Sequence, residues 1–480
     1  MAQIALPGIE FMVILQILII FVSATALLLI DLFIPASQKR ITAMLALAAT
    51  VAALIAGPFS QSGTTMANAV AFGPSTLIVN SIILFATAIS ILFASDAMQK
   101  QGIERGETYV LMLLATGGML LLAQGASLVT LFMGLELLSI ALYVLTAIAY
   151  PRIASEEAGL KYLIIGAFGT GFLVFGIAFT FGATGSLVLS EIAARIPSSG
   201  IERGLFFSGI GLMLVGFGYK VSLVPFHMWT PDVYQGAPTP VTAFLSVGSK
   251  AAGFAVAGRL LEPFLAADQL RGTTTALLMA VAAATLVLGN LAAIPQSNFK
   301  RLLGYSSIAH AGFLLLALGA NTAVGSLSPR MIVAYYLAGY LFMSLTAFAV
   351  LVVINRTDSA DDFKAFNGLH QRSPFLAFAI TVAAASLAGV PLTAGFTGKF
   401  LAFSAAAGAH QWALLAIAAA AASAGFYYYF KVLRHVFWNR PAEGAAPITV
   451  PPLTRLLVVA LITCTFAAGI FFQPFVNLLR

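Results

Sequence analysis

The sequence predicts an all-α polytopic membrane protein. Of its 480 residues, 60% are hydrophobic and only 9% are charged, whereas roughly 25% of the residues of a soluble domain are charged. Apolar runs of about 20 residues, the length that crosses a hydrocarbon core, recur along the whole chain. By this criterion we expect about fourteen transmembrane helices.

The expected spans fall into four groups along the chain. They comprise an N-terminal three-helix segment (1–100), a first five-helix repeat (108–261), a second repeat (274–437) and a C-terminal helix (453–480). The runs themselves lie near 11–30, 41–57, 75–95, 108–124, 126–149, 159–181, 205–227, 238–261, 274–294, 302–320, 330–354, 375–405, 412–437 and 453–473.

Spacing along the chain indicates that spans 4–8 and 9–13 are repeats. Val224-Pro225 and Val390-Pro391 lie 166 residues apart, and the same shift moves spans 4–8 close to spans 9–13. Because five is an odd number of crossings, the second copy must enter the membrane from the opposite side. This gives the inverted-repeat arrangement that is common among transporters.

Two of these spans are expected to be broken helices. The run 375–405 would span about 46 Å as one helix, against a hydrocarbon core of roughly 30 Å, and it contains Pro391 in a Gly- and Pro-rich stretch. Its counterpart, 205–227, contains Pro225. Paired interruptions indicate a transport site, since the freed carbonyls can hold water and ions.

The distribution of positive charge predicts the topology. If the N-terminus is outside, 14 of the 24 Lys and Arg residues lie in inner loops and six in outer loops or the C-terminal tail. Both termini should then face away from the cytoplasm. The first apolar run lacks a basic region before it, so we expect a retained helix. With no targeting presequence visible, we expect the bacterial plasma (inner) membrane; an organelle-encoded chain, which would also lack a presequence, is the alternative.

Four charged residues lie inside otherwise apolar stretches, and we interpret them as a proton or ion path. They are Glu136, Lys220, Lys250 and Lys399. A charge near the bilayer centre costs ~2.5–3.5 kcal/mol on insertion scales, so a chain that keeps several is expected to use them. We expect Glu136 to pair with Lys220. Burial disfavours the charged ammonium groups of Lys220 and Lys250, which favours proton exchange.

Each of these residues also has a structural interpretation. Glu136 would then be a protonated carboxyl in a hydrogen bond between helices, Lys220 and Lys250 would reach the interface, and Lys399 would cap carbonyls freed by the helix break. Three further residues are possible relays: Lys161 near the end of its span, and His227 and His310 at span ends. Snorkelling for Lys161, and a satisfied core histidine for the others, are the alternatives.

The sequence disfavours several other kinds of chemistry. Cys464 is the single cysteine, which excludes an internal disulfide and any cluster that needs several thiolates from this chain. No nucleotide-binding glycine motif and no closely spaced Cys/His set is present. The net charge of +7 reflects topology, so no nucleic acid partner is expected. Redox centres, if any, should belong to partner subunits.

Two stretches carry a family resemblance: Lys220-VSLVPFHMWTPDVYQGAPTPVTAFLSVGS-Lys250, and PQSNFKRLLGYSSIAHAGF at 295–313. Both resemble the core motifs of the antiporter-like membrane subunits of respiratory complex I, and the likeness extends over spans 4–13. The variant TPDVYQGAP, the chain length and the lysine at 399 are similar to the N-type subunits of the proton-pumping NADH:quinone oxidoreductase.

The resemblance implies proton translocation through half-channels joined by ionisable side chains and water. Glu136 and Lys220 match the Glu–Lys pair of the family, Lys250 its central lysine and Lys399 the group on the second broken helix. Lys161, His227 and His310 fall at positions similar to the polar axis of the family. No cofactor is implied in this chain; FMN, iron–sulfur clusters, NADH and quinone would lie in the parent complex. The implied partners are other membrane subunits, including antiporter-like neighbours, and the lipid bilayer.

Two other functions remain open from the sequence. The first is a subunit of a multi-subunit cation/proton antiporter, which the same inverted repeats would serve. The second is a passive membrane scaffold, which explains the spans but not the deep charges.

Overall fold

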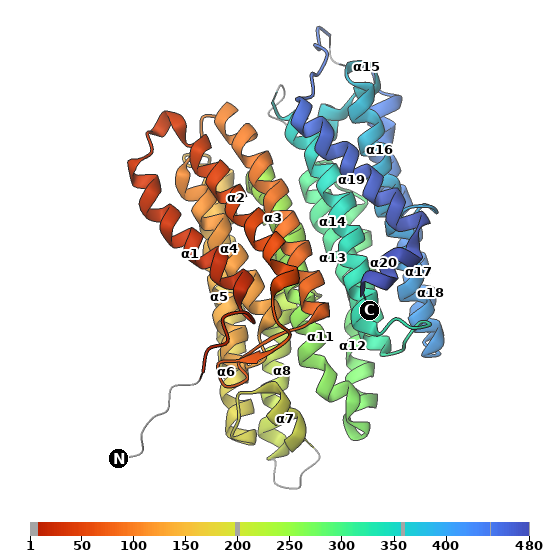
Figure 1. The fold of residues 1–480 in the computed structure, drawn as a ribbon. Coiled ribbons are helices and arrows are strands. Elements are labelled where there is room, and N and C mark those ends of the chain that lie inside the picture. The colour runs from red at the N-terminus through yellow and green to blue at the C-terminus, as the bar shows by residue number, and fades with distance from the viewer. Residues whose placement is uncertain (1–7, 197–201, 357–360, 442, 480) are drawn as a thin grey trace.

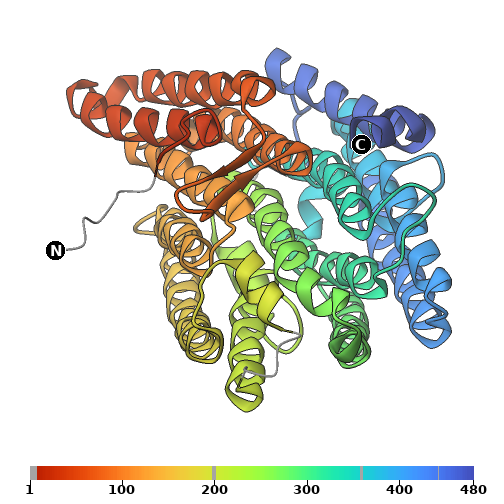
Figure 2. The same ribbon diagram turned by 60° about the horizontal axis from the view of Figure 1, so that its bottom comes forward.

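The computed structural model describes residues 8–196, 202–356, 361–441 and 443–479, and this part of the chain is almost entirely helical. Its only two strands, β1 (Gly63–Thr65) and β2 (Val70–Phe72), form a short antiparallel hairpin. The hairpin lies near the end of a helix because Val70 forms a bridge with Gly125, and Figure 2 shows it across one end of the bundle.

The first part of the chain ends just after the first broken span and forms ten helices. They are α1 (Leu15–Ile30), α2 (Arg40–Ala56), α3 (Pro74–Lys100), α4 (Gly106–Gln124), α5 (Leu128–Ala147), α6 (Ile153–Thr184), α7 (Leu189–Arg195), α8 (Arg203–Lys220), α9 (Trp229–Gly236) and α10 (Thr239–Phe244). Short 3-10 turns flank α1 and α2 at Asp31–Phe33, Ala36–Gln38 and Gly57–Phe59.

The second part follows a π-helical segment, Leu245–Ser249. Its helices are α11 (Lys250–Ala266), α12 (Asp268–Ala293), α13 (Phe299–Ala320), α14 (Pro329–Ile354), α15 (Leu369–Arg372), α16 (Pro374–Ala388), α17 (Ala394–Gly408), α18 (Trp412–Phe437), α19 (Pro452–Ile470) and α20 (Phe472–Leu479), with a 3-10 turn at Phe363–Phe366.

Helix lengths agree with the predicted membrane fold. Twelve helices in the described part are long and apolar enough to cross a membrane. Two further spans are interrupted: one consists of α8 and α9, the other of α16 and α17. Pro225 lies in the first gap and Pro391 in the second, where proline cannot continue a helix. The broken helices predicted at spans 7 and 12 are confirmed, and they bring the total to the expected fourteen.

A recurring backbone pairing supports the inverted repeats. In each half, the backbone at the start of the second helix of the repeat (α5 or α13) pairs with the segment that follows the third helix (α6 or α14). The four bonds run from Leu128 N to Leu187 O (2.8 Å), Leu189 N to Ala126 O (2.9 Å), Phe299 N to Asp361 O (2.7 Å) and Phe363 N to Ser297 O (2.9 Å). The domain boundaries drawn from the sequence stay a prediction.

Glycine allows neighbouring helices of the first repeat to approach closely. A Cβ on Gly118 of α4 would lie 2.6 Å from the backbone nitrogen of Leu138 on α5, and a Cβ on Gly134 of α5 would lie 2.8 Å from the nitrogen of Leu122. Small residues at helix interfaces let backbones pack in van der Waals contact within a bilayer. These two helices therefore form a tight pair that holds α5 in place.

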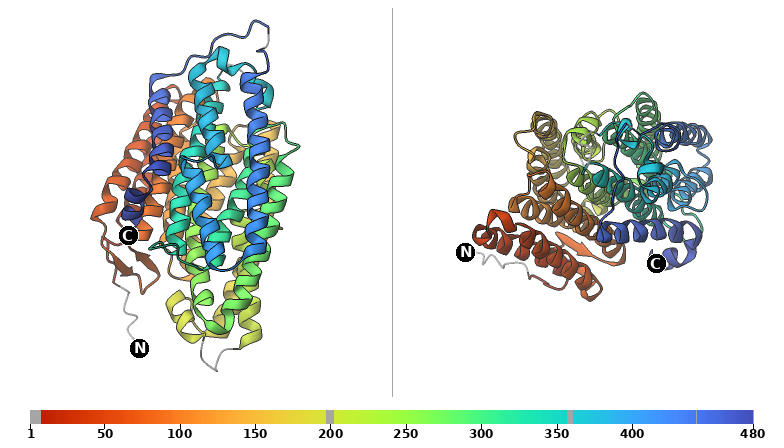
Figure 3. Two further views of the ribbon diagram at one scale, coloured as in Figure 1. Left: turned by 90° about the vertical axis from the view of Figure 1, so that its right-hand side faces the viewer. Right: turned by 90° about the horizontal axis from the view of Figure 1, so that it is seen from above.

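The arrangement of helices places α13 and α14 at the centre of the bundle. Both are almost wholly buried, whereas α1, α2, α6 and α19 keep much of their surface exposed. Seen from above, α1–α3 and α19 lie along one edge and the two repeats lie behind them (Figure 3). The long axes of the helices are roughly parallel, as expected for a bundle that crosses a membrane (Figure 1).

Candidate functional site

Three buried lysines lie at or near interruptions of their helices. Lys220 is the last residue of α8, Lys250 is the first residue of α11 after the π-helical segment, and Lys399 lies one turn into α17 after the second break. Their exposed fractions are 2%, 5% and 6%. Irregular helix geometry frees backbone groups for new partners and is frequent at functional sites. The sequence identified these lysines, but it did not reveal the π-helical segment.

Lys220 faces the same part of α5 as Glu136 without touching it. The ammonium of Lys220 donates to Ser139 Oγ at 2.9 Å, one helical turn beyond Glu136, and lies 3.5 Å from the hydroxyl oxygen of Tyr162. Glu136, which is half-buried, accepts a 2.6 Å hydrogen bond from Thr170 Oγ1 on α6. The ion pairs of the described residues do not include Glu136 with Lys220, so the structure does not bring the expected pair into direct contact.

Aromatic side chains surround Lys220 and link its surroundings to the next helix segment. The Lys220 ammonium lies 5.7 Å from the centre of the Tyr162 ring, which stacks on Trp229 with a centroid distance of 4.5 Å. Trp229 Nε1 donates to Tyr219 O at 2.9 Å. Since Trp229 opens α9, these contacts fasten the two parts of the broken span around the lysine, and cation–π attraction partly replaces its lost hydration.

Lys250 is bound to α13. Its ammonium donates to Ser307 O at 2.7 Å and lies 5.8 Å from the centre of the Tyr340 ring. Ser307 Oγ in turn accepts a 2.9 Å hydrogen bond from Tyr234 on α9. Ser307 therefore connects the helix that follows Lys220 with Lys250 itself.

His310 extends the polar contacts along α13 toward α14. Its Nδ1 is 2.8 Å from the hydroxyl of Tyr336, and its Nε2 is 3.5 Å from the hydroxyl of Tyr429, which also bonds Ser306. The imidazole centre lies 5.1 Å from that of the Tyr340 ring beside Lys250. His310 thus lies in the same polar cluster as Lys250.

Lys399 binds the end of the preceding half-helix. Its ammonium donates to Leu387 O at 2.9 Å and to Ala388 O at 2.8 Å, the last carbonyls of α16, and it lies 5.1 Å from the centre of the Phe313 ring on α13. A cation at a helix C-terminus is favoured by the helix dipole. Lys399 therefore caps the freed carbonyls, as its structural interpretation expects. It also places a buried amine at the break.

The two other possible relays lie outside this cluster. His227, in the first break, is half-buried, and among the described residues its Nδ1 has no hydrogen-bond partner. The side chain of Lys161 is 42% exposed, and it pairs with Glu157 at 2.6 Å and with Asp232 at 3.0 Å. Asp232 also binds Arg301. The structure thus joins Lys161 to one exposed acid, Glu157, and one half-buried acid, Asp232.

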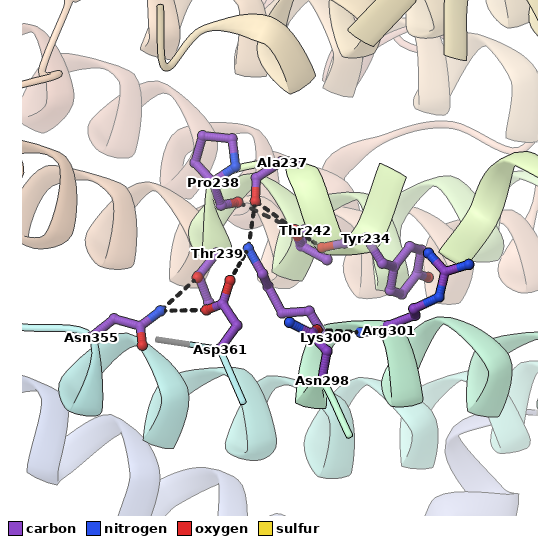
Figure 4. A network of polar contacts seen from close by, with 10 residues as sticks. All are labelled: Tyr234, Ala237, Pro238, Thr239, Thr242, Asn298, Lys300, Arg301, Asn355 and Asp361. Carbon is purple, nitrogen blue, oxygen red and sulfur yellow. Dashed lines mark hydrogen bonds and ion pairs between the residues drawn. The ribbon is translucent and has the colours of Figure 1, made fainter. Parts of the chain in front are cut away.

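The structure contains a fourth buried lysine, which the sequence did not single out. Lys300 is only 3% exposed. Its ammonium lies 2.7 Å from a carboxylate oxygen of Asp361 and donates to Ala237 O at 2.9 Å. Asn355 donates both to Asp361 Oδ1 (2.8 Å) and to Thr239 Oγ1 (3.2 Å). Figure 4 shows this network tying the start of α10 to the start of α13.

Helical periodicity could have identified Lys300 from the sequence. Lys300 and Ser307 are seven residues apart, and His310 follows Ser307 by three, so all three share one face of α13. The residues that contact His310 (Tyr336 and Tyr340) and Lys220 (Ser139) carry no charge and are ordinary residues of membrane helices. The sequence therefore gave no reason to single them out. Among the described residues, no cluster of three or more His, Cys, Asp or Glu side chains is arranged to hold a metal ion.

A row of buried cations across two inverted repeats, each with a broken helix, defines an antiporter-like membrane subunit. The family model described as NADH:quinone oxidoreductase/Mrp antiporter, TM, matches residues 125–424. The chain belongs to this family, which confirms the family resemblance carried by the two motifs.

Whole-length relatives are subunits of one enzyme. NADH-quinone oxidoreductase subunit N 2 of Roseiflexus castenholzii is 44% identical over 100% of this chain and 98% of the relative. NADH-quinone oxidoreductase subunit N of Chloroflexus aggregans is 41% identical over 99% and 97%. A chain of respiratory complex I from Thermus thermophilus superposes with a TM-score of 0.80 at 34% identity, covering 96% of this chain and 98% of that chain.

A more distant structure shares the fold alone. A chain of the Mrp complex from Dietzia superposes with a TM-score of 0.82 at 20% identity, covering 97% of this chain and 95% of that chain. The fold is therefore common to different membrane complexes.

Proposed function

We propose that this chain is the N-type, proton-translocating membrane subunit of an NADH:quinone oxidoreductase. The observation that carries the proposal is the row of buried cationic side chains, Lys220, Lys250 and Lys399, with His310 between the last two. A buried ionisable group in a membrane span is costly and serves by default as a candidate transport site. The 44% identity to a subunit N over the whole chain supports this assignment.

The proposed mechanism is electrostatic. A change in a neighbouring subunit alters the interaction of Glu136 with Lys220, and a proton then moves from Lys220 through Lys250 toward Lys399. A pair of charges at 4 Å interacts by about 4 kcal/mol at an effective dielectric constant of 20, and about 1.4 kcal/mol shifts a proton equilibrium tenfold. Forming or separating such a pair is therefore sufficient to drive a transfer.

The position of Glu136 supports control by a neighbour. The side chain is only half-buried, between α5 and α6. Exposed apolar side chains surround this face, among them Met133, Ile140 and Phe168. Apolar surface of this kind suits contact with another membrane subunit, and a partner packed there would reach the Glu136 carboxylate without crossing the bundle. Lys161 and His227 are secondary candidates for the same path.

The proposal includes location and cofactors. We place the chain in the bacterial plasma membrane with both termini on the non-cytoplasmic side, as the distribution of Lys and Arg indicates. FMN, iron–sulfur clusters, NADH and quinone would be held by other subunits, so this chain would contribute to a translocase without a redox site of its own.

Purification tests the proposal against the antiporter alternative. An affinity tag on this chain should recover flavin- and iron–sulfur-containing subunits, and inverted vesicles should pump protons when NADH is supplied. Recovery of a complex without those subunits, together with sodium-dependent proton exchange in vesicles, would instead favour a cation/proton antiporter.

A further inference from the structure

An apolar groove runs along the edge of the bundle, away from the buried lysines. It lies between α2, α3, α14 and α19 and has a volume of about 790 Å³. Figure 1 looks onto this edge, with α2 and α3 on one side and α19 on the other. Most of the lining is aliphatic or aromatic, including Leu47, Phe85, Leu92, Phe342 and Leu457.

The groove offers almost no hydrogen bonds to a ligand. Ser81 Oγ donates to the carbonyl of Leu77 in its own helix at 2.8 Å. The hydroxyl of Tyr335 donates to Ala468 O at 2.6 Å. The remaining polar atom of the described lining is the thiol of Cys464, a weak donor. An occupant must therefore be a hydrocarbon along most of its length.

One end of the groove is rich in basic side chains. Arg40 begins α2, Lys100 ends α3 and Arg455 lies in the first turn of α19, within about two helical turns of the lining residues on the same helices. These three helix ends lie at the same end of the groove, since α3 packs against both α2 and α14, and α14 packs against α19.

These three basic side chains are available to an anion. All three are exposed, and none forms an ion pair with a carboxylate in the described part of the chain, whereas the nearby acids Asp31 and Asp96 are paired with other cations. The Arg455 guanidinium lies 5.4 Å from the centre of the Phe375 ring, a contact that leaves its N–H donors free to bind a phosphate.

We propose that this groove binds an anionic phospholipid. The acyl chains lie against α3, α14 and α19, and the headgroup phosphate lies at the basic end formed by Arg40, Lys100 and Arg455. Basic residues beside membrane helices recognise anionic headgroups in this way, and an apolar groove without free hydrogen-bonding groups suits the chains. The proposal stands independently of proton translocation.

The lipid would support the cluster around His310 through α14. This helix presents Tyr335, Ala338 and Phe342 to the groove, while Tyr336 and Tyr340 on its other side contact His310. An occupied groove packs against the back of the helix that holds His310. Emptying it would loosen this support without removing any residue of the polar cluster.

Photochemical labelling of the intact complex tests the proposal. The complex is reconstituted in nanodiscs with phosphatidylglycerol or phosphatidylcholine that carry the same diazirine-bearing acyl chain, and labelled peptides are mapped. We expect the α3 and α19 peptides that line the groove to be labelled by phosphatidylglycerol at least about fivefold more than by phosphatidylcholine, the factor expected from one basic residue near an anionic lipid. Unlabelled phosphatidylglycerol should compete.

Matched variants separate the two parts of the site. Arg40→Gln combined with Arg455→Gln should bring the labelling ratio of the two lipids close to one. Ala338→Phe, which fills the groove, should reduce labelling by both lipids, whereas Ala419→Leu on the exposed face of α18 should leave labelling unchanged. Equal labelling by the two lipids in the unmodified chain would mean annular lipid only, and labelling blocked by a helix of a neighbouring subunit would mean a protein interface. Either result overturns the proposal.

Discussion

The ammonium of Lys300 lies 2.7 Å from a carboxylate oxygen of Asp361, and this ion pair is buried on the lysine side and largely buried on the aspartate side. The two residues belong to segments 61 positions apart in the sequence. Because Lys300 also binds the carbonyl of Ala237, the pair holds the start of the span that carries Lys250. Loss of this ion pair should therefore lower the stability of the chain before it affects proton translocation.

Asp361→Asn should destabilise the chain because it leaves the Lys300 ammonium buried without a counter-charge. Breaking a buried pair from one side typically costs about 3–5 kcal/mol. Thermal unfolding of the purified membrane arm, or the yield of assembled complex, measures this loss. The double variant Lys300→Met with Asp361→Asn should be more stable than the single variant. An additive double-mutant cycle would contradict the coupling of the two residues.

Thr170→Val should weaken proton pumping by removing the 2.6 Å hydrogen bond to Glu136. A hydrogen bond to a charged group contributes about 1.5–3 kcal/mol, so its loss releases Glu136 from its position beside α6. Thr170→Ser keeps the hydroxyl and should retain pumping. Acidification assays in inverted vesicles compare the two variants. Equal pumping by both would show that this hydrogen bond has no part in translocation.

Lys399→Arg separates the structural from the proton-carrying role of Lys399. Arginine can still donate to Leu387 O and Ala388 O, so the variant should assemble. An arginine side chain does not release its proton in proteins, so pumping should fall. Lys399→Met should lose both, since two buried carbonyls at about 1–3 kcal/mol each are left without a donor. Full pumping by an assembled Lys399→Arg complex would show that Lys399 acts only as a helix cap.

Gly118→Ala tests the close packing of α4 and α5. The added methyl would lie 2.6 Å from the backbone nitrogen of Leu138, so the helices must separate, at a cost of about 1–3 kcal/mol. Gly171→Ala on α6 is the matched control, because no atom lies within 4 Å of the added carbon. Thermal unfolding of the two variants should show a lower midpoint for Gly118→Ala alone, and equal midpoints would contradict the packing.

The sequence predicted those features of the fold that depend on hydrophobicity and on helix-breaking residues. The spans follow from apolar runs, and the breaks follow from Pro225 and Pro391, because proline interrupts the helix wherever the bundle places it. The buried lysines Lys220, Lys250 and Lys399 were visible because a charge within an apolar run is rare. These features are local, so no knowledge of neighbouring helices was needed.

The sequence did not predict which groups these side chains contact. Lys220 binds Ser139 where Glu136 was expected, one turn away on the same helix. That difference depends on how α5 and α8 are rotated and shifted against each other, which hydrophobic periodicity does not determine. Lys300 was not singled out for a related reason. Its partner Asp361 lies in a polar segment far along the chain, and only the packed bundle brings the two together.

The central claim is that protons cross the bundle through Lys250, and the ratio of protons pumped to electrons transferred in a Lys250→Met complex tests it most directly. Methionine approximates the length of the side chain and cannot carry a proton. The account predicts that the assembled complex pumps fewer protons per electron than the unmodified enzyme. An assembled Lys250→Met complex with an unchanged ratio would contradict it.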